Sequence, residues 1–202
     1  CAIRWPGVIK PGTVLNETSS HADMLPTRAG AAGEPDSVAK LKKGFKSGNK
    51  TFKVHIDGYN LLPFLKGEVK ESPRKGFIYW SDDGDLMALR VGNWKCTFME
   101  QRAHGLEVGE EPLVTKRLPD IYNLRSDPFE RATEDADLFY GKWKADRAFL
   151  LVPAQQIVGE FLATFKEFPP RQRPASFSID QALEKARKSQ DAMAQSGGAG
   201  VK

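Results

Sequence analysis

The segment from residue 77 to 99 constrains the fold of this chain more than any other. Two dipeptides, Asp83-Gly84 and Gly92-Asn93, divide it, and both accept the positive φ of a two-residue hairpin loop. From Trp94 to Met99 apolar and polar side chains alternate, which is the period of a strand with one apolar face. The pattern predicts an antiparallel meander over residues 77–81, 85–91 and 94–99, with a fourth strand at 120–124.

A helical pattern follows the predicted sheet. Apolar residues recur every three or four positions from Ala154 to Phe168, so one helical face is expected to cover the sheet. Pro153 predicts a kink or a helix restart, and Pro169-Pro170 ends the pattern. The fold class is therefore α+β, a four-stranded antiparallel sheet packed by a C-terminal helix.

The first third of the chain contains shorter elements. Residues 1–5 have the composition of a buried strand that ends at Pro6-Gly7. Ser19 and Ser20 are candidate N-caps for a short helix that Gly33 ends. A basic connector follows, with one or two helical turns after Ser37 and a strand at 51–56.

Composition narrows the class of protein. The chain has 202 residues and a net charge of +4, with both signs interleaved, and no nucleic-acid-binding motif accompanies the charge. We therefore expect no nucleic-acid binding. We also expect no membrane span, because no apolar run reaches the required length. Cys1 and Cys96 lack metal-ligand spacing, and a single bridge between them stays open.

Few residues form a pattern that indicates a catalytic, metal-binding or ligand-binding site. The acidic run 82–85 lacks the alternate spacing of a calcium loop and fits a hairpin turn. His21 and His55 fit packing or capping roles. His104 lies beside Gly105 in a long loop directly after a strand, where a rigid scaffold often presents functional groups. Without a nucleophile elbow or a phosphate-binding loop, the residues alone lead no further than an α+β domain.

Several segments in order nevertheless resemble the C-terminal part of sulfatases of the alkaline-phosphatase-like superfamily, particularly bacterial arylsulfatases. They are Ile3-Arg4-Trp5-Pro6-Gly7, Pro11-Gly12-Thr13, Ser20 to Thr27, Asp57 to Pro63, Ser72-Pro73-Arg74, Arg90 to Lys95, and Tyr122 to Leu124 with Asp127 to Glu130. Each segment is short, but their collinear order makes the resemblance specific over residues 1 to about 168.

The resemblance implies an organisation for the chain. Residues 1–35 would be the last strand and helix of a truncated α/β core, and 36–74 a connector with a short strand and helix. Residues 75–168 would form the C-terminal α+β subdomain. Residues 169–202 are expected to be a polar helix, with Ser178 as its candidate N-cap, and a flexible tail.

The resemblance also implies hydrolysis of sulfate esters. The family uses a formylglycine, made from the Cys or Ser of a C/S-x-P-x-R motif, and a calcium ion held by Asp and Asn. Cys1 and Cys96 lack the Pro of that motif, and Ser126 lacks its Arg, since Glu130 stands there. We therefore expect no catalytic residue, metal ligand or cofactor in this chain. Calcium and formylglycine are implied only for the complete enzyme.

By the same resemblance, His104, Gln101 and Arg102 are expected to border the substrate pocket of that enzyme. The chain would then be an inactive C-terminal fragment of an arylsulfatase-type sulfuric ester hydrolase. The complete enzyme would act on a small-molecule or glycan sulfate ester in the periplasm or outside the cell. The alternative is a stand-alone, non-catalytic α+β module with a binding or structural role.

Overall fold

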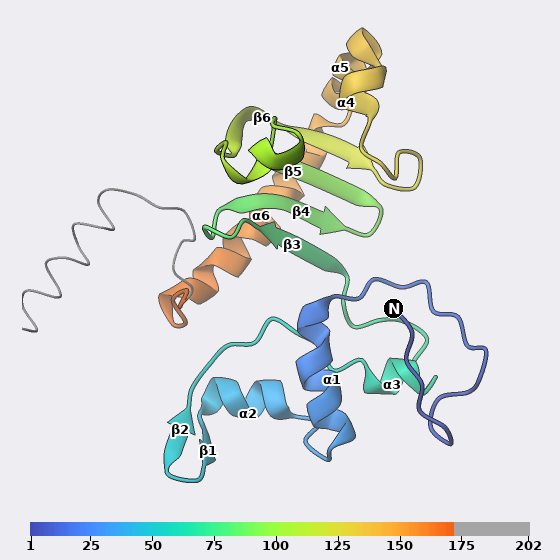
Figure 1. The fold of residues 1–202 in the computed structure, drawn as a ribbon, viewed down its shortest axis with the longest axis vertical. Coiled ribbons are helices and arrows are strands. Elements are labelled where there is room, and N and C mark those ends of the chain that lie inside the picture. Colours follow the sequence, from blue (N-terminus) through green and yellow to red (C-terminus); the bar gives the residue numbers. More distant parts are fainter. Residues whose placement is uncertain (172–202) are drawn as a thin grey trace, which may run out of the picture.

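A four-stranded antiparallel sheet forms the upper part of the molecule in the computed structural model, which describes residues 1–171 (Figure 1). Its strands lie side by side in chain order, which confirms the predicted meander and fourth strand. Gly84 and Gly92 have φ of 89° and 57°, as turns at these positions require, but the first loop is one residue longer than predicted, since the Ser81 N–H donates to the Asp85 carbonyl and residues 82–84 form the turn. The strands are β3 (Gly76–Trp80), β4 (Leu86–Val91), β5 (Trp94–Glu100) and β6 (Val114–Asn123).

Strand β6 begins six residues before the predicted strand. Thr97 pairs with Asp120 and Met99 pairs with Thr115, so residues 116–119 of β6 stand opposite Phe98 alone. This irregularity lets the strand continue past Pro119, which cannot donate a ladder hydrogen bond. The preceding loop is shorter than expected and contains the 3-10 helix η2 (Gly105–Gly109).

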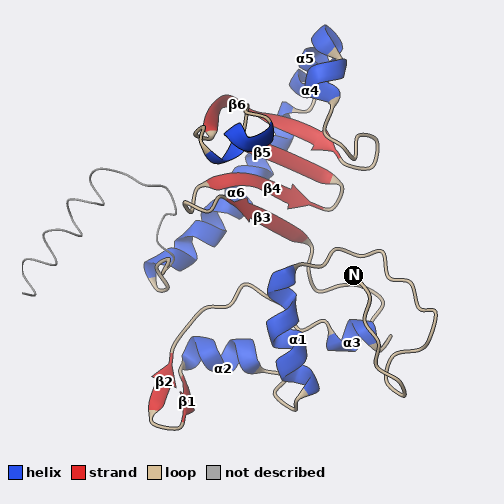
Figure 2. Ribbon diagram, in the orientation of Figure 1, coloured by secondary structure: helices blue, strands red, loops and turns tan. Residues whose placement is uncertain are grey.

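One face of the sheet is covered by α6 (Leu151–Ala163), which runs behind the strands in Figure 2. Because α6 starts two residues before Pro153, the proline occupies the first turn, where no intrahelical donor is lost. Leu89, Cys96, Ile121 and Ala154 form the buried core between helix and sheet. The short helices η3 (Ala148–Leu150) and η4 (Thr164–Lys166) extend α6 at its two ends.

Two further helices lie at the free edge of β6. They are α4 (Ala132–Asp135) and α5 (Asp137–Ala145). The Tyr140 hydroxyl accepts a hydrogen bond from the Ile121 N–H and donates one to its carbonyl, each at 3.1 Å. The Tyr140 side chain therefore satisfies the backbone N–H and carbonyl of Ile121 at the edge of β6, which would otherwise have no partner strand there.

The lower part of the molecule carries small elements with little buried core (Figure 2). Ser20 caps η1 through a capping box with Asp23, and Gly33 has φ of 96° after the helix, so both predicted helix ends are confirmed. The elements are η1 (His21–Asp23), α1 (Met24–Ala31), α2 (Ser37–Lys43), the hairpin β1 (Phe45–Ser47) and β2 (Lys50–Phe52), and α3 (Leu62–Leu65).

Two expectations need correction. No strand forms at residues 1–5, because no neighbouring strand is present among the described residues, and Ile3 and Trp5 remain exposed. The strand expected at 51–56 ends at Phe52. The helix predicted from Ser178 and the glycine-rich tail lie outside the described residues. Cys1 is exposed and Cys96 buried, and both are free thiols.

One helical stretch, Ala148–Lys166, is long and apolar enough to cross a membrane by length and composition, with a mean hydropathy of 1.4. Only 6% of that window is buried. Its inner side nevertheless packs on the sheet, with Phe161 and Phe165 at 6.0 and 5.8 Å from the ring of Trp80. Length and composition alone are weak grounds for a span.

Candidate functional site

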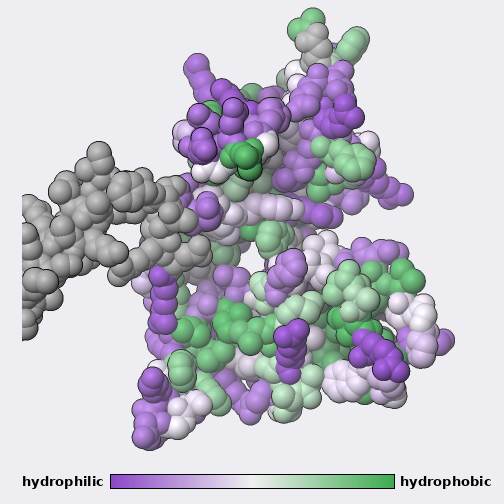
Figure 3. Space-filling view, viewed as in Figure 1, coloured by the Kyte–Doolittle hydropathy of each residue, from purple (hydrophilic) through white to green (hydrophobic). Residues whose placement is uncertain are grey.

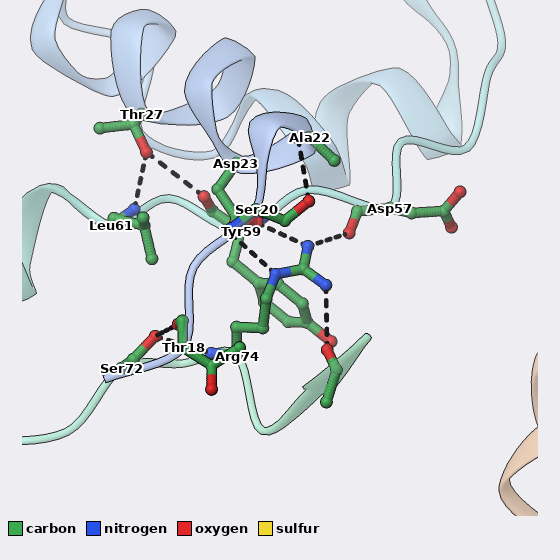
Figure 4. A network of polar contacts seen from close by, with 11 residues as sticks. Thr18, Ser20, Ala22, Asp23, Thr27, Asp57, Tyr59, Leu61, Ser72 and Arg74 are labelled. Atoms are coloured by element: carbon green, nitrogen blue, oxygen red, sulfur yellow. Dashed lines mark hydrogen bonds and ion pairs between the residues drawn. The ribbon is translucent and has the colours of Figure 1, made fainter. Parts of the chain in front are cut away.

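Asp23 and Arg74 form a buried, two-pronged ion pair where η1 meets the chain leading into β3 (Figure 4). Arg74 Nε lies 2.7 Å from Asp23 Oδ2, and Nη2 lies 2.6 Å from Oδ1. Asp23 is fully buried, and Arg74 is 7% exposed. Three of the segments that resemble sulfatases, those containing Asp23, Tyr59 and Arg74, therefore converge at one point.

The remaining hydrogen-bonding groups of this pair are also used. Asp23 accepts the backbone N–H of Ser20 and of Tyr59, each at 2.8 Å. Arg74 donates to the carbonyls of Asp57 at 2.9 Å and Gly76 at 3.1 Å. Burial raises the pKa of Asp23, but the hydrogen bonds from Arg74, Tyr59 and Ser20 outweigh it, so the pKa lies below its ordinary value.

Hydroxyl groups complete the network. The Thr27 hydroxyl accepts the Leu61 N–H at 2.9 Å, and the Ser72 hydroxyl donates to the Thr18 carbonyl at 2.9 Å. A Cβ at Gly58 would stand 2.0 Å from the Ala22 carbonyl oxygen, so only glycine fits there. The network has no free acid, base or nucleophile. It fixes the lower part of the molecule to the sheet rather than acting on a substrate.

The residues predicted to border a substrate pocket lie in the loop between β5 and β6. Gln101 and Arg102 line an open hollow of about 310 Å³, together with Ala103, Glu107, Glu111, Pro112 and Val114. His104 is exposed at the start of η2 and is not among the residues that line the hollow. The structure thus brings two of the three predicted residues together and leaves the third beside them.

Hydrogen bonds show what these side chains do in the described chain. Gln101 Nε2 donates to the Val108 and Glu111 carbonyls at 3.2 and 2.8 Å, so Gln101 shapes the loop. Arg102 Nε lies 2.8 Å from Glu100, which also pairs with Lys116. Hydrogen bonds from Lys116 and Arg102 hold the pKa of Glu100 below its ordinary value. The hollow therefore offers one exposed guanidinium, already paired, rather than a convergent cationic cluster.

The described residues do not fit a calcium or formylglycine centre. No group of three or more His, Cys, Asp or Glu side chains within residues 1–171 is placed to hold a metal ion. The buried carboxylates are engaged, Asp23 by Arg74, and Asp120 by Lys116 and Lys144. Cys96 is buried in the apolar core, which raises the pKa of its thiol. No chemical step through either group is derived for this chain.

Comparison with known proteins shows that the chain is similar to sulfatases. It is sulfatase-like, and it corresponds to a C-terminal portion at low sequence identity. The antiparallel sheet with its helices matches a solved sulfatase structure. No family model matches the chain.

Individual relatives show how far the likeness extends. The chain is 30% identical over 147 residues to the steryl-sulfatase of Mus musculus, a match that covers 65% of the chain and 21% of that protein. It is 30% identical over 148 residues to the arylsulfatase of Hemicentrotus pulcherrimus, covering 63% and 24%. The PsFucS1 sulfatase from Pseudoalteromonas sp. superposes with a TM-score of 0.53 at 24% identity, over 82% of the chain and 29% of that structure.

The chain thus spans about a quarter of the length of these relatives.

The sequence interpretation missed the ion pair, although Asp23 and Arg74 both stand in segments that resemble the family. A single acidic residue among apolar neighbours in Ala22 to Pro26 is the signal that pointed to it.

Proposed function

We propose that this chain is the C-terminal part of a longer arylsulfatase-type sulfuric ester hydrolase and is inactive alone. The observation that carries the proposal is the match itself, which covers about two thirds of the chain but only 21–24% of the two curated relatives. The nucleophile and metal-binding motifs would lie upstream of residue 1. The complete protein would act on a small-molecule or glycan sulfate ester.

The surface of the lower part supports this proposal. In Figure 3 the apolar areas of this face are largest over the lower part of the molecule. Few apolar residues of the lower part expose less than a tenth of their surface; they are Pro26, Leu61 and Phe64. Exposed apolar side chains there include Ile3, Val14, Leu15, Leu25, Phe45, Phe52 and Val69. Such a surface is typical of a part that packs against more protein.

The coding sequence ahead of Cys1 is the most direct test. A C/S-x-P-x-R motif and acidic pairs there would support the proposal. A start codon immediately before Cys1 would instead favour the stand-alone module. In that case the formylglycine and the calcium ion that the family uses have no place in the protein.

Activity gives a second test. The 202-residue chain is expected to release no product from an aryl sulfate with calcium added, whereas the complete protein is expected to hydrolyse it. Turnover by the chain alone would contradict the proposal. Cell fractionation of the complete protein tests its proposed periplasmic or secreted location.

We propose that His104, with its neighbours Arg102 and Gln101, borders the substrate pocket of the complete enzyme. Arg102→Ala and His104→Ala are each expected to raise KM for an anionic sulfate ester several-fold with little change in kcat. Arg125→Ala, which removes an exposed guanidinium in a different loop, is the matched control. Unchanged kcat and KM in both loop variants over several sulfate esters would remove this assignment.

A further inference from the structure

A second, smaller hollow is lined by the end of β6 and by α4 and α5. Figure 1 shows these two helices at the top of the molecule. The volume of the hollow is about 210 Å³. The residues that line it are Ile121, Tyr122, Asn123, Ser126, Asp127, Ala132, Ala136, Phe139, Tyr140 and Trp143. It is separate in sequence and in lining residues from the loop hollow of the proposed substrate border.

Four of its ten lining residues are aromatic. Tyr122 and Tyr140 stack at 6.0 Å with 23° between their planes, and Tyr140 and Trp143 at 6.0 Å with 21°. Phe139 stands at the rim with 85% of its surface exposed. Ala132 and Ala136 are too small to fill the space in front of these rings. Aromatic pairs in offset stacked arrangements gain energy beyond the area that they bury, so a further ring is a suitable neighbour for these residues.

Several polar groups in the wall already have partners. Asp127 accepts the N–H groups of Arg131 and Ala132, each at 3.0 Å. The Tyr140 hydroxyl is engaged by Ile121, and the Tyr122 hydroxyl lies 3.3 Å from Thr133 Oγ1. A ligand would therefore find apolar contacts here and no vacant hydrogen-bonding partner among these groups.

The charges around the hollow further restrict the class of ligand that fits. The Asp127 carboxylate disfavours an anion, and its N–H partners leave it little attraction for a cation. Cations already lie over two of the rings, with Lys144 at 5.3 Å from the Tyr140 centroid and Arg147 at 4.3 Å from that of Trp143. An uncharged group fits this setting best.

From this geometry we infer that the hollow between β6, α4 and α5 is a binding site for a small, uncharged aromatic molecule. Its size supports one or two fused rings, because apolar cavities of about 150 Å³ already hold benzene. This site does not depend on the proposed sulfatase activity.

Titration with indole, followed by NMR of the alanine methyl groups in the 202-residue chain, tests the site. Indole is expected to shift the Ala132 and Ala136 signals saturably and to leave Ala163, on the exposed side of α6, unchanged. Indole-3-acetate, the same ring with a carboxylate, is expected to bind at least tenfold more weakly. Equal binding of both compounds, or no localised shift, would overturn the inference.

Two variants secure the assignment. Ala136→Leu fills the hollow and is expected to weaken indole binding at least tenfold, whereas the matched Ala163→Leu changes it less than twofold. If Ala136→Leu does not fold by circular dichroism, Phe139→Ala decides, because Phe139 is exposed and its loss should weaken binding several-fold without unfolding. Unchanged affinity in the folded variant contradicts the site. Movement of the same methyl signals on dilution alone would show a second copy as the occupant and would equally refute it.

Discussion

Asp23 and Arg74 hold their charges inside the protein, where each depends on the other. A buried pair contributes little net stability relative to an apolar replacement, but an unpaired buried charge is costly. The pair is also shared between distant segments, because its hydrogen bonds reach Ser20, Tyr59 and the Asp57 carbonyl. At the scale of single residues, removal of one partner of this pair should therefore be costly.

Asp23→Asn is expected to lower the free energy of unfolding by about 3 to 5 kcal/mol, because Arg74 keeps its charge without a counter-ion. Urea unfolding at pH 7 measures the change. The matched control is Asp146→Asn, which breaks the exposed pair with Lys142 and should cost about 0.5 kcal/mol or less. Equal losses in the two variants would contradict the role of burial.

The same carboxylate predicts a pH dependence. Its pKa is lowered on folding, so the unfolded chain binds the proton more readily. The stability it contributes is complete above the unfolded value of about 3.9 and is lost as the pH falls through the folded pKa. Unfolding measured from pH 6 down to pH 2.5 should therefore show a smaller loss for Asp23→Asn than for the native chain. Parallel curves would show that Asp23 does not titrate with folding.

At the scale of elements, close backbone approach decides which segments meet. Gly58 lies against the Ala22 carbonyl, and Gly76 lies against that of Arg90, so neither backbone tolerates a side chain. These contacts join η1 to the 57–61 segment and β3 to β4. By contrast, Gly159 on α6 has open space around it.

Gly58→Ala is expected to destabilise the chain by more than about 2 kcal/mol, since backbone must move to admit the methyl group. Gly159→Ala is the control, and it should stabilise α6 by about 0.5 to 1 kcal/mol through helix propensity. Thermal unfolding followed by circular dichroism distinguishes the two. A neutral Gly58→Ala would show that the approach to Ala22 is not tight.

The contact between α6 and the sheet allows a second matched pair. Ala154 is buried against the core, so Ala154→Leu overpacks it and should cost about 1 to 3 kcal/mol. Ala163→Leu places the same side chain on the exposed surface of the helix and should be close to neutral. Urea unfolding of both variants measures the difference. Similar values would mean that α6 is not seated on the sheet as described.

At the scale of the whole molecule, protection from solvent is uneven. Residues 2–5 donate no backbone hydrogen bond to the described part of the chain, whereas β5 is paired on both sides. Amide exchange in the 202-residue chain is therefore expected to be fast at Ile3 and Trp5 and slow at Cys96. Strong protection of residues 2–5 would contradict the view that their partners belong to a larger protein.

The sequence alone determined the elements that depend on neighbours along the chain. The two hairpin turns follow from the φ that Gly84 and Gly92 accept, and the helix restart follows from Pro153. The capping box at Ser20 is also local, because it lies within four residues. Side-chain period and turn chemistry act over a few residues, so their effect is visible in the sequence.

Only the tertiary structure decided how distant segments meet. It paired Asp23 with Arg74 across 51 residues, and it carried β6 past Pro119 by an irregularity against Phe98. It also left residues 1–5 without a strand and placed His104 outside the hollow that Gln101 and Arg102 line. These outcomes depend on which partners are present in space, and local propensity carries no information about them.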